Sequence, residues 1–170
     1  MKFRKAAISD IHQIQAIEED FYEGFKLTGI ILRDWIDNLS ENFLVAEDGR
    51  KLVGCIFWEQ LDEIKAIPYF HQSQDFHKSG GEYAYISEVG VLDKNADLLQ
   101  QLFNRVVKLA RQKNIKTIIW VTGLDEGGHT AMERDLIEKS GFKKLKPVGR
   151  WEYAPGKFSK KHWIFIKELK

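Results

Sequence analysis

A carboxylate inside an apolar strand is the sequence feature best suited to proton transfer. Glu88 lies in the apolar run from Glu82 to Leu92. Strand alternation places its side chain on the same face as Ile86 and Gly90. Removing water around a carboxylate raises its pKa toward the range in which it accepts a proton from an ammonium group. Glu88 is therefore our candidate catalytic base, and a structural carboxylate paired with a nearby Arg or Lys is the alternative left open.

Other residue types that often carry chemistry are present, but their patterns do not fit a reactive site. Cys55 lies in the apolar run Leu52–Trp58, where burial raises the pKa of a thiol and weakens it as a nucleophile. The 5 histidines lack metal-ligand spacing, and with 1 cysteine in the chain we expect no metal site. The loop Gly123–Gly128 lacks the Lys and the hydroxyl that complete a phosphate-binding loop, and no serine stands in a nucleophile-elbow sequence.

Length and charge predict one domain without a nucleic-acid or membrane partner. The chain has 170 residues, 44% of them hydrophobic, so we expect a single domain over residues 1–170. Its 26 Lys and Arg against 25 Asp and Glu give a net charge of +1, whereas binding to nucleic acid or a membrane surface usually needs a basic excess. We find no signal peptide and no apolar run that could span a bilayer, and we expect a cytoplasmic protein.

The chain begins with a short predicted strand near Lys2–Ala7 and an amphipathic helix. Apolar residues recur at helical spacing from Ile11 to Phe21, directly after the capping pair Ser9-Asp10. The acids Glu18–Asp20 are expected largely on the opposite face of this helix. A second, shorter helix is expected through Leu32–Leu39.

The middle of the chain predicts strands and one long connection. Two β-rich runs, Phe43–Glu47 and Lys51–Trp58, flank the turn Asp48-Gly49 and predict an antiparallel hairpin. The segment Leu61–Gly81 has no clear period and is expected to be a long loop, either a surface excursion or a functional lid. Glu82–Leu92 is apolar on both faces, which is typical of a strand in the middle of a covered sheet.

The second half of the chain predicts a parallel crossover. Asn95 caps a long helix whose apolar face extends from Leu98 to Ala110, and the strand Lys116–Val121 follows. With the preceding strand, these elements form a strand, helix, strand unit with parallel pairing. A helix and two last strands complete the series, at Thr130–Lys139, Lys143–Tyr153 and His162–Glu168.

This order of elements resembles the GCN5-related N-acetyltransferases over nearly the whole chain. The segment Ile86–Val91 is similar to the family's fourth strand, and Glu138–Phe142 is similar to the end of its fourth helix. The resemblance implies an α/β fold: a mixed, mostly antiparallel sheet with a splayed central parallel strand pair, flanked by helices. It also implies transfer of an acyl group from acetyl-CoA to an amine.

The resemblance assigns particular positions to acetyl-CoA. The backbone of Val89, Gly90 and Val91 would contact the pantetheine arm and the thioester carbonyl. The pyrophosphate would lie at the N-terminus of the next helix, where free N–H groups and the helix dipole favour an anion. In this sequence, that segment consists of Lys94, Asn95, Ala96, Asp97 and Leu98.

Two features depart from the family pattern. The family follows its fourth strand with Arg or Gln and a run of glycines, whereas the corresponding segment here has no glycine and carries Asp93 and Asp97. A Tyr often stands four residues before the Gly of the Gly-Phe pair, and that position here is Ile137. Tyr153 is the substitute candidate for the general acid that protonates the departing thiolate. An aromatic residue packed at the rim is the alternative for Tyr153.

The sequence therefore predicts an acyl-CoA-dependent N-acyltransferase in which the amine attacks directly and Glu88 is the base. The acceptor is expected to be a small-molecule or peptide amine that enters between the first two helices and the long loop. The acids Glu18–Asp20 and Glu23 near this opening favour a cationic amine. The alternative is a non-catalytic domain of the same fold that has lost coenzyme A and binds a small molecule or a protein. A homodimer joined through the last strands is compatible with both.

Overall fold

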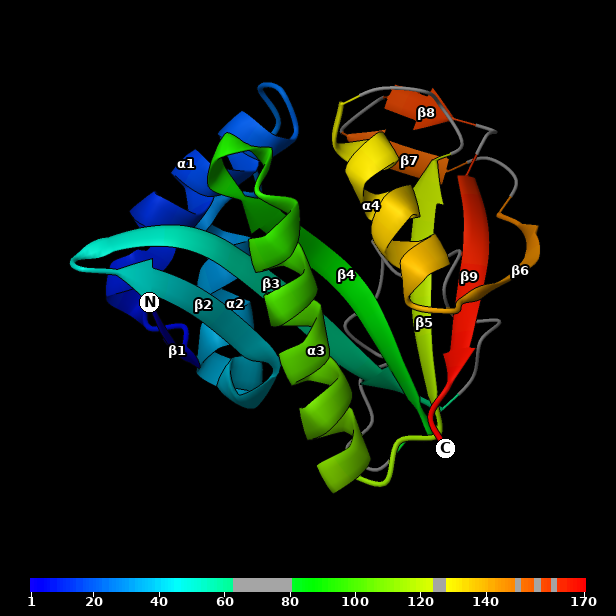
Figure 1. The fold of residues 1–170 in the computed structure, drawn as a ribbon. Coiled ribbons are helices and arrows are strands. Elements are labelled where there is room, and N and C mark those ends of the chain that lie inside the picture. The colour runs from blue at the N-terminus through cyan, green and yellow to red at the C-terminus, as the bar shows by residue number, and fades with distance from the viewer. Residues whose placement is uncertain (63–80, 124–127, 149–150, 155–156, 160–161) are drawn as a thin grey trace. The chain divides into compact units, whose positions relative to one another are not determined.

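The structure is a computed structural model that describes residues 1–62, 81–123, 128–148, 151–154, 157–159 and 162–170. Seven strands form one sheet in the order β1-β2-β3-β4-β5-β9-β6, and β7 pairs with β8 separately (Figure 1). The strands are β1 (Lys2–Lys5), β2 (Phe43–Asp48), β3 (Lys51–Leu61), β4 (Tyr83–Val91), β5 (Thr117–Gly123), β6 (Lys143–Pro147), β7 (Trp151–Ala154), β8 (Lys157–Ser159) and β9 (His162–Glu168). The helices are η1 (Ile8–Asp10), α1 (Ile11–Phe21), α2 (Gly29–Leu39), η2 (Ser40–Asn42), η5 (Leu92–Lys94), α3 (Ala96–Gln112) and α4 (Gly128–Lys139).

The sheet is mixed, and its central parallel pair is β4 with β5. Pairs β1–β2, β2–β3, β5–β9 and β6–β9 are antiparallel. The β4–β5 register runs from Tyr83↔Thr117 to Ile86↔Trp120, and Glu88–Val91 of β4 lie beyond it. The predicted α/β fold, with a mixed, mostly antiparallel sheet and a central parallel pair, is confirmed.

Two compact units make up the chain. The first comprises residues 1–58 and 88–106, and the second comprises residues 59–87 and 107–170. Strands β3 and β4 and helix α3 therefore contribute residues to both units. The expectation of a single domain over residues 1–170 stays a prediction.

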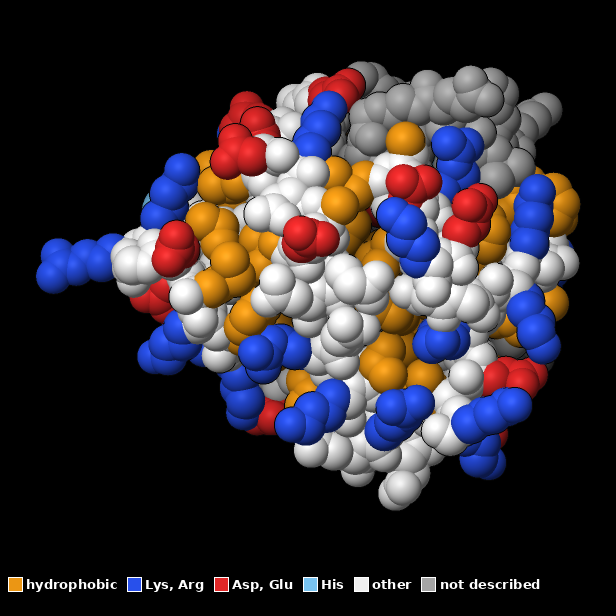
Figure 2. All heavy atoms as spheres, viewed as in Figure 1, with side chains coloured by type: hydrophobic (Ala, Val, Ile, Leu, Met, Phe, Trp, Pro, Cys, Tyr) orange, Lys and Arg blue, Asp and Glu red, His pale blue; other side chains and the backbone are white. Residues whose placement is uncertain are grey.

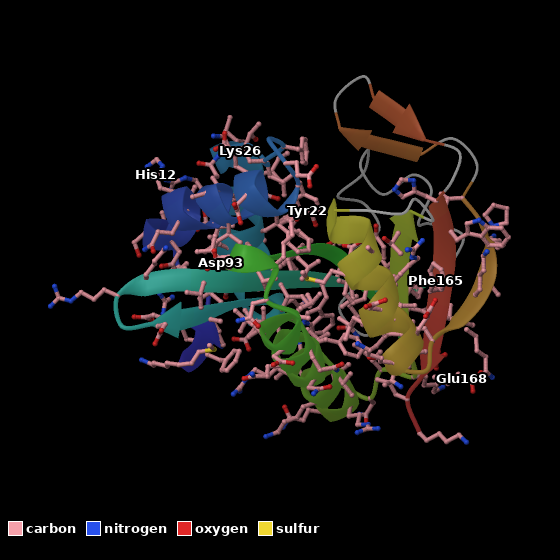
Figure 3. The ribbon with its side chains drawn as sticks, turned by 45° about the horizontal axis from the view of Figure 1, so that its top comes forward. His12, Tyr22, Lys26, Asp93, Phe165 and Glu168 are labelled. Atoms are coloured by element: carbon pink, nitrogen blue, oxygen red, sulfur yellow. The ribbon has the colours of Figure 1, made fainter. Side chains whose placement is uncertain are left out.

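In the first unit, helices lie on both faces of the β2–β3 hairpin. Buried residues of α1 and α2, including Ile14 and Leu32, pack against Cys55 and Phe57 of β3. On the opposite face, an ideal Cβ placed on Gly54 would lie 3.1 Å from side-chain atoms of both Leu98 and Leu102 of α3. Figures 1 and 3 show α3 on one side of β2 and β3, and α1 on the other.

The predicted hairpin and the first two helices are confirmed, but one face of α1 was predicted wrongly. The turn residue Gly49 has φ +65°, which the Asp48-Gly49 signal had indicated. Glu18, expected with Glu19 and Asp20 on the polar face of the helix, is 0% exposed. Its spacing explains this, because Glu18 lies on the same side of the helix as Ile14 and Phe21.

The second unit has its own core, to which β3, β4, β5 and β9 contribute Leu61, Tyr85, Ile119 and Ile164. The prediction of one strand over Lys143–Tyr153 is wrong. Strand β6 ends at Pro147, and the next N–H, that of Val148, donates at 3.0 Å to the carbonyl of His162, where β9 begins. Among the described residues, β9 offers no further partner beyond this point, and β7 pairs with β8 in the separate two-stranded sheet. Tyr153 therefore belongs to a short hairpin and not to a strand beside β9.

The distribution of charged residues and the lengths of the apolar helices agree with what the composition predicted. Figure 2 shows basic and acidic side chains spread over the same face of the protein. Among the described residues, no helix is both long and apolar enough to cross a bilayer. The connection expected between Leu61 and Gly81 lies, at residues 63–80, outside the described residues.

Candidate functional site

The end of β4 packs closely against α1 in the first unit. Gly90 makes this approach possible, because a Cβ at this position would lie 2.8 Å from Cγ2 of Ile17. Strand alternation places Glu88 on the same, α1-facing side as Gly90. Glu88 is 6% exposed. The predicted burial of the candidate base is therefore confirmed, and its catalytic role stays a prediction.

Glu18 is a second buried carboxyl in this unit, and it comes from α1. Its Oε2 atom accepts the backbone N–H of Leu27 at 2.9 Å. Its Oε1 atom is buried and has no hydrogen-bond partner among the described residues. Burial raises the pKa of Glu18 from its ordinary value of 4.5 to about 7, against the opposing effect of the Leu27 hydrogen bond. Glu18 can therefore exchange a proton near neutral pH.

Cys55 of β3 lies within electrostatic range of both carboxyls. Burial raises the pKa of its thiol well above the ordinary value of 9.0, and the negative charges of Glu18 and Glu88 raise it further. The expected burial of the Cys55 thiol is confirmed. An ideal Cβ on Gly90 would lie 3.6 Å from Sγ of Cys55, so the thiol lies against the end of β4.

Tyr22, at the end of α1, reaches the backbone of β4. Its hydroxyl oxygen accepts the N–H of Val89 at 3.4 Å, and Oε1 of Glu88 accepts the same N–H at 3.2 Å. Phe21 and Phe25 contact the Tyr22 ring edge-on, with centroids 5.1 and 6.3 Å away. Figure 3 shows Tyr22 at the end of α1. One of the predicted cofactor-contacting residues, Val89, thus presents its N–H to a phenol hydroxyl and a carboxyl.

The segment from β4 to α3 is tightly folded although it contains no glycine. Asp93 and Lys94 have φ of 55° and 47°, the left-handed region that non-glycine residues rarely adopt. Figure 3 labels Asp93 in this segment, which packs beside α1. Nζ of Lys94 lies 3.2 Å from Oε1 of Glu23 in an exposed ion pair. Lys94 is therefore held by an acid of the α1–α2 connection.

The predicted cap of α3 is confirmed. The side-chain oxygen of Asn95 accepts the N–H of Leu98 at 3.0 Å. The N–H groups of Ala96 and Asp97 belong to the first turn, which has no intrahelical acceptor for them. Leu98 is 2% exposed and its side chain is directed at Gly54 of β3. The Leu98 side chain therefore packs toward β3 and not toward the expected pyrophosphate position. In a non-catalytic domain that had lost coenzyme A, an apolar side chain could occupy that position.

Neither Ile137 nor Tyr153, the two positions considered for the general acid, supplies a hydroxyl among the described side chains. Ile137 of α4 is 1% exposed and belongs to the interior of the second unit. The side chain of Tyr153 lies outside the described residues, so its role stays a prediction. Tyr22, which was not singled out from the sequence for this role, brings a described phenol to the backbone of Val89. Its contact with Val89 joins residues 67 positions apart, so no local sequence signal could indicate it.

Two further buried carboxyls, Glu59 and Glu133, lie in the second unit and were not singled out from the sequence. Burial raises the pKa of both, to about 7 for Glu133. Hydrogen bonds from Thr122 and Trp120 oppose the shift at Glu133. Among the described residues, no group of three or more His, Cys, Asp or Glu is arranged to hold a metal ion.

Solved structures of the same fold cover the whole chain. A GNAT-like decarboxylase, GphF, in complex with isobutyryl-CoA has a TM-score of 0.83 at 15% identity, covering 100% of both chains. The loading GNATL domain of CurA from Lyngbya majuscula has a TM-score of 0.81 at 13% identity, covering 99% of this chain and 97% of that domain. The NatB acetyltransferase complex bound to CoA and MES gives a TM-score of 0.75 at 14% identity, covering 100% of both chains. No family model and no curated protein matches the chain.

The chain has the fold of the GCN5-related N-acetyltransferases, as the order of its predicted elements indicated. At identities of 13 to 15%, these similarities define the fold, and the chemistry must be argued from the residues of the site.

Proposed function

We propose that this protein is a cytoplasmic, acyl-CoA-dependent acyltransferase that acylates an amine. The observation that carries the proposal is the group of polar atoms at the end of β4. The N–H of Val89 lies beyond the β4–β5 register, beside the Tyr22 hydroxyl and the buried Glu88. A backbone donor, a phenol and a carboxyl are the three groups that acyl transfer from a thioester requires.

Each group has a definite task in this reaction. Glu88 accepts a proton from the acceptor ammonium, which leaves a nitrogen lone pair free to attack. The N–H of Val89 donates to the carbonyl oxygen as the N–C bond forms and negative charge develops there. As the C–S bond breaks, the Tyr22 hydroxyl gives its proton to the thiolate, and the nitrogen releases its second proton to solvent. Solvent then reprotonates Tyr22 and takes the proton from Glu88, so that one proton is released overall.

Acetyl-CoA fits the N-terminus of α3 in part. The N–H groups of Ala96 and Asp97 can donate to a pyrophosphate, and the helix dipole favours an anion there. Asp93 and Asp97 oppose this attraction, and both are exposed and screened by water. Lys94 can replace part of the missing positive charge if it exchanges Glu23 for a phosphate. We therefore propose acetyl-CoA as the acyl donor, bound more weakly than in a site with a glycine-rich loop.

The first test is binding. Purified protein is titrated calorimetrically with acetyl-CoA and with desulfo-CoA, and its melting temperature is measured with each ligand. Binding of both ligands is the expected result. If neither ligand binds at millimolar concentration, the acyltransferase proposal fails, and a non-catalytic domain of the same fold becomes the better description.

The second test separates the catalytic groups. With acetyl-CoA and a panel of primary amines, Glu88→Gln and Tyr22→Phe are each expected to lower kcat by about 100-fold or more while leaving acetyl-CoA affinity nearly unchanged. Tyr153→Phe is the matched comparison for the acid. If Tyr153→Phe lowers kcat and Tyr22→Phe does not, the acid has been assigned to the wrong residue.

Decarboxylation of a carboxylated acyl-CoA is a second candidate, favoured by the TM-score of 0.83 with the GNAT-like decarboxylase. Such a substrate brings a carboxylate next to the thioester. The buried carboxyls Glu18 and Glu88 would repel it, because like charges in a dry site are costly to bring together. We therefore prefer amine acylation. Release of CO2 from malonyl-CoA by the wild-type protein, with no acylation of any amine, would reverse this preference.

A further inference from the structure

Glu18 is a buried acid for which no described group supplies a compensating positive charge. It is 0% exposed, and its Oε1 atom has no hydrogen-bond partner among the described residues. It lies in the last turn of α1, where the helix dipole disfavours a negative charge. An ionised carboxyl in these surroundings gains strongly from any cation that reaches Oε1.

Glu88 of β4 faces α1, as Gly90 does. An ideal Cβ on Gly90 would lie 2.8 Å from Cγ2 of Ile17, the residue that precedes Glu18 in α1. The neighbouring positions of α1 that face the core are apolar and buried, namely Ile14, Ile17 and Phe21. Two carboxyls with apolar walls suit an organic ammonium group. A metal ion is less suited, since no group of three or more ligands occurs among the described residues.

We propose that Glu18 binds the ammonium group of the acceptor, so that the acceptor is a small protonated primary amine. The inference deepens the proposed acyltransferase function and depends on it. Glu18 fixes the nitrogen through Oε1, and Glu88 takes its proton. We assign proton transfer to Glu88 and ammonium binding to Glu18 because Glu88, and not Glu18, accepts the Val89 N–H that the Tyr22 hydroxyl also accepts.

The connection between α1 and α2 covers Glu18, and an amine must displace part of it to reach Oε1. Two hydrogen bonds join Leu27 to α1: its N–H donates to Glu18 at 2.9 Å, and Nε2 of Gln15 donates to its carbonyl at 2.8 Å. Leu27 also packs against the core, and the N–H of Gly24 donates to the Glu19 carbonyl at 2.8 Å. The Lys26–Glu19 ion pair at its edge is exposed and contributes little. Glu23 and Gly24 have positive φ, so the chain turns sharply directly after α1.

The decisive comparison is Glu18→Gln with Glu19→Gln, which removes a neighbouring exposed charge of the same helix. With saturating acetyl-CoA, Glu18→Gln is expected to raise the KM for the amine about 10-fold to 100-fold, with kcat changed little. Glu19→Gln is expected to leave KM unchanged, and both variants should bind acetyl-CoA like the wild type. Equal KM values for the two variants would overturn the proposal, as would a loss confined to kcat.

A second measurement needs no catalysis. The melting temperature of the wild-type protein is measured with n-butylamine hydrochloride, n-butanol and sodium butyrate at equal ionic strength and pH 8. Only the amine is expected to stabilise the protein, and Glu18→Gln, where it folds, should abolish the effect. An equal shift with the alcohol or with sodium ions alone would refute ammonium binding. If acetyl-CoA does not bind, the acyltransferase function fails, and this measurement still decides whether Glu18 binds an amine.

Discussion

Replacing Glu18 by Gln should stabilise the protein increasingly as the pH rises. The pKa of Glu18 is raised from 4.5 to about 7 because the carboxyl is buried. Below pH 4.5 the carboxyl is protonated in both the folded and the unfolded chain. Between pH 4.5 and about 7 only the unfolded chain releases the proton, so the free energy of unfolding of the wild type falls progressively. Above pH 7 the loss is complete.

The size of the effect follows from the two pKa values. A change from 4.5 to about 7 corresponds to about 3 kcal/mol in the free energy of unfolding at alkaline pH. Gln is neutral at every pH and its side-chain oxygen can still accept the Leu27 N–H. The difference in unfolding free energy between Glu18→Gln and wild type should therefore grow by up to about 3 kcal/mol between pH 5 and pH 8.5.

Urea unfolding followed by tryptophan fluorescence measures this difference, because Trp58 and Trp120 are 0% and 2% exposed and change surroundings on unfolding. Glu19→Gln is the control. Glu19 is exposed and pairs with Lys26, so its difference from wild type should stay below about 1 kcal/mol. A pH-independent difference for Glu18→Gln, or one that shrinks as the pH rises, would refute the burial of a neutral Glu18.

Three further perturbations test the packing and the helix terminus. Gly90→Ala should lower the free energy of unfolding by about 1 to 3 kcal/mol, because the new methyl would overlap Ile17; an unchanged melting temperature in calorimetry would contradict the close contact of α1 with β4. Asn95→Ala should cost about 1 kcal/mol in urea unfolding, since it removes the acceptor of the Leu98 N–H, and no loss would mean that the cap is not formed. Asp97→Arg should strengthen acetyl-CoA binding several-fold at low salt and less at high salt, and weaker calorimetric binding would contradict the phosphate position.

Much of the fold followed from local patterns. The apolar run Glu82–Leu92, the Asp48-Gly49 turn and the cap at Asn95 depend on neighbouring residues, and each is confirmed at or near its predicted place. The failure at Lys143–Tyr153 has a physical cause, because β6 reaches the first residue of β9 at Val148 and the next strand, β7, finds its partner in β8. Strand pairing of this kind is decided by tertiary contacts and not by propensity.

The candidate site was only partly accessible from sequence. Glu88 could be predicted as a buried carboxyl because strand period alone places it among apolar residues. Glu18 could also have been found, since its distance from Ile14 and Phe21 along α1 is that of a shared helix face. Its charge favoured the opposite interpretation, and charged residues are indeed rarely buried without a partner.

The sequence by itself determined the element order, the α/β fold and the burial of Glu88, because periodicity and turn chemistry act over a few residues. Only the tertiary structure decided that Tyr22 meets the N–H of Val89 and that Glu18 and Glu88 share the surroundings of Cys55. These contacts join α1 to strands far along the chain. They depend on how closely a helix can approach Gly90, a distance that no local pattern encodes.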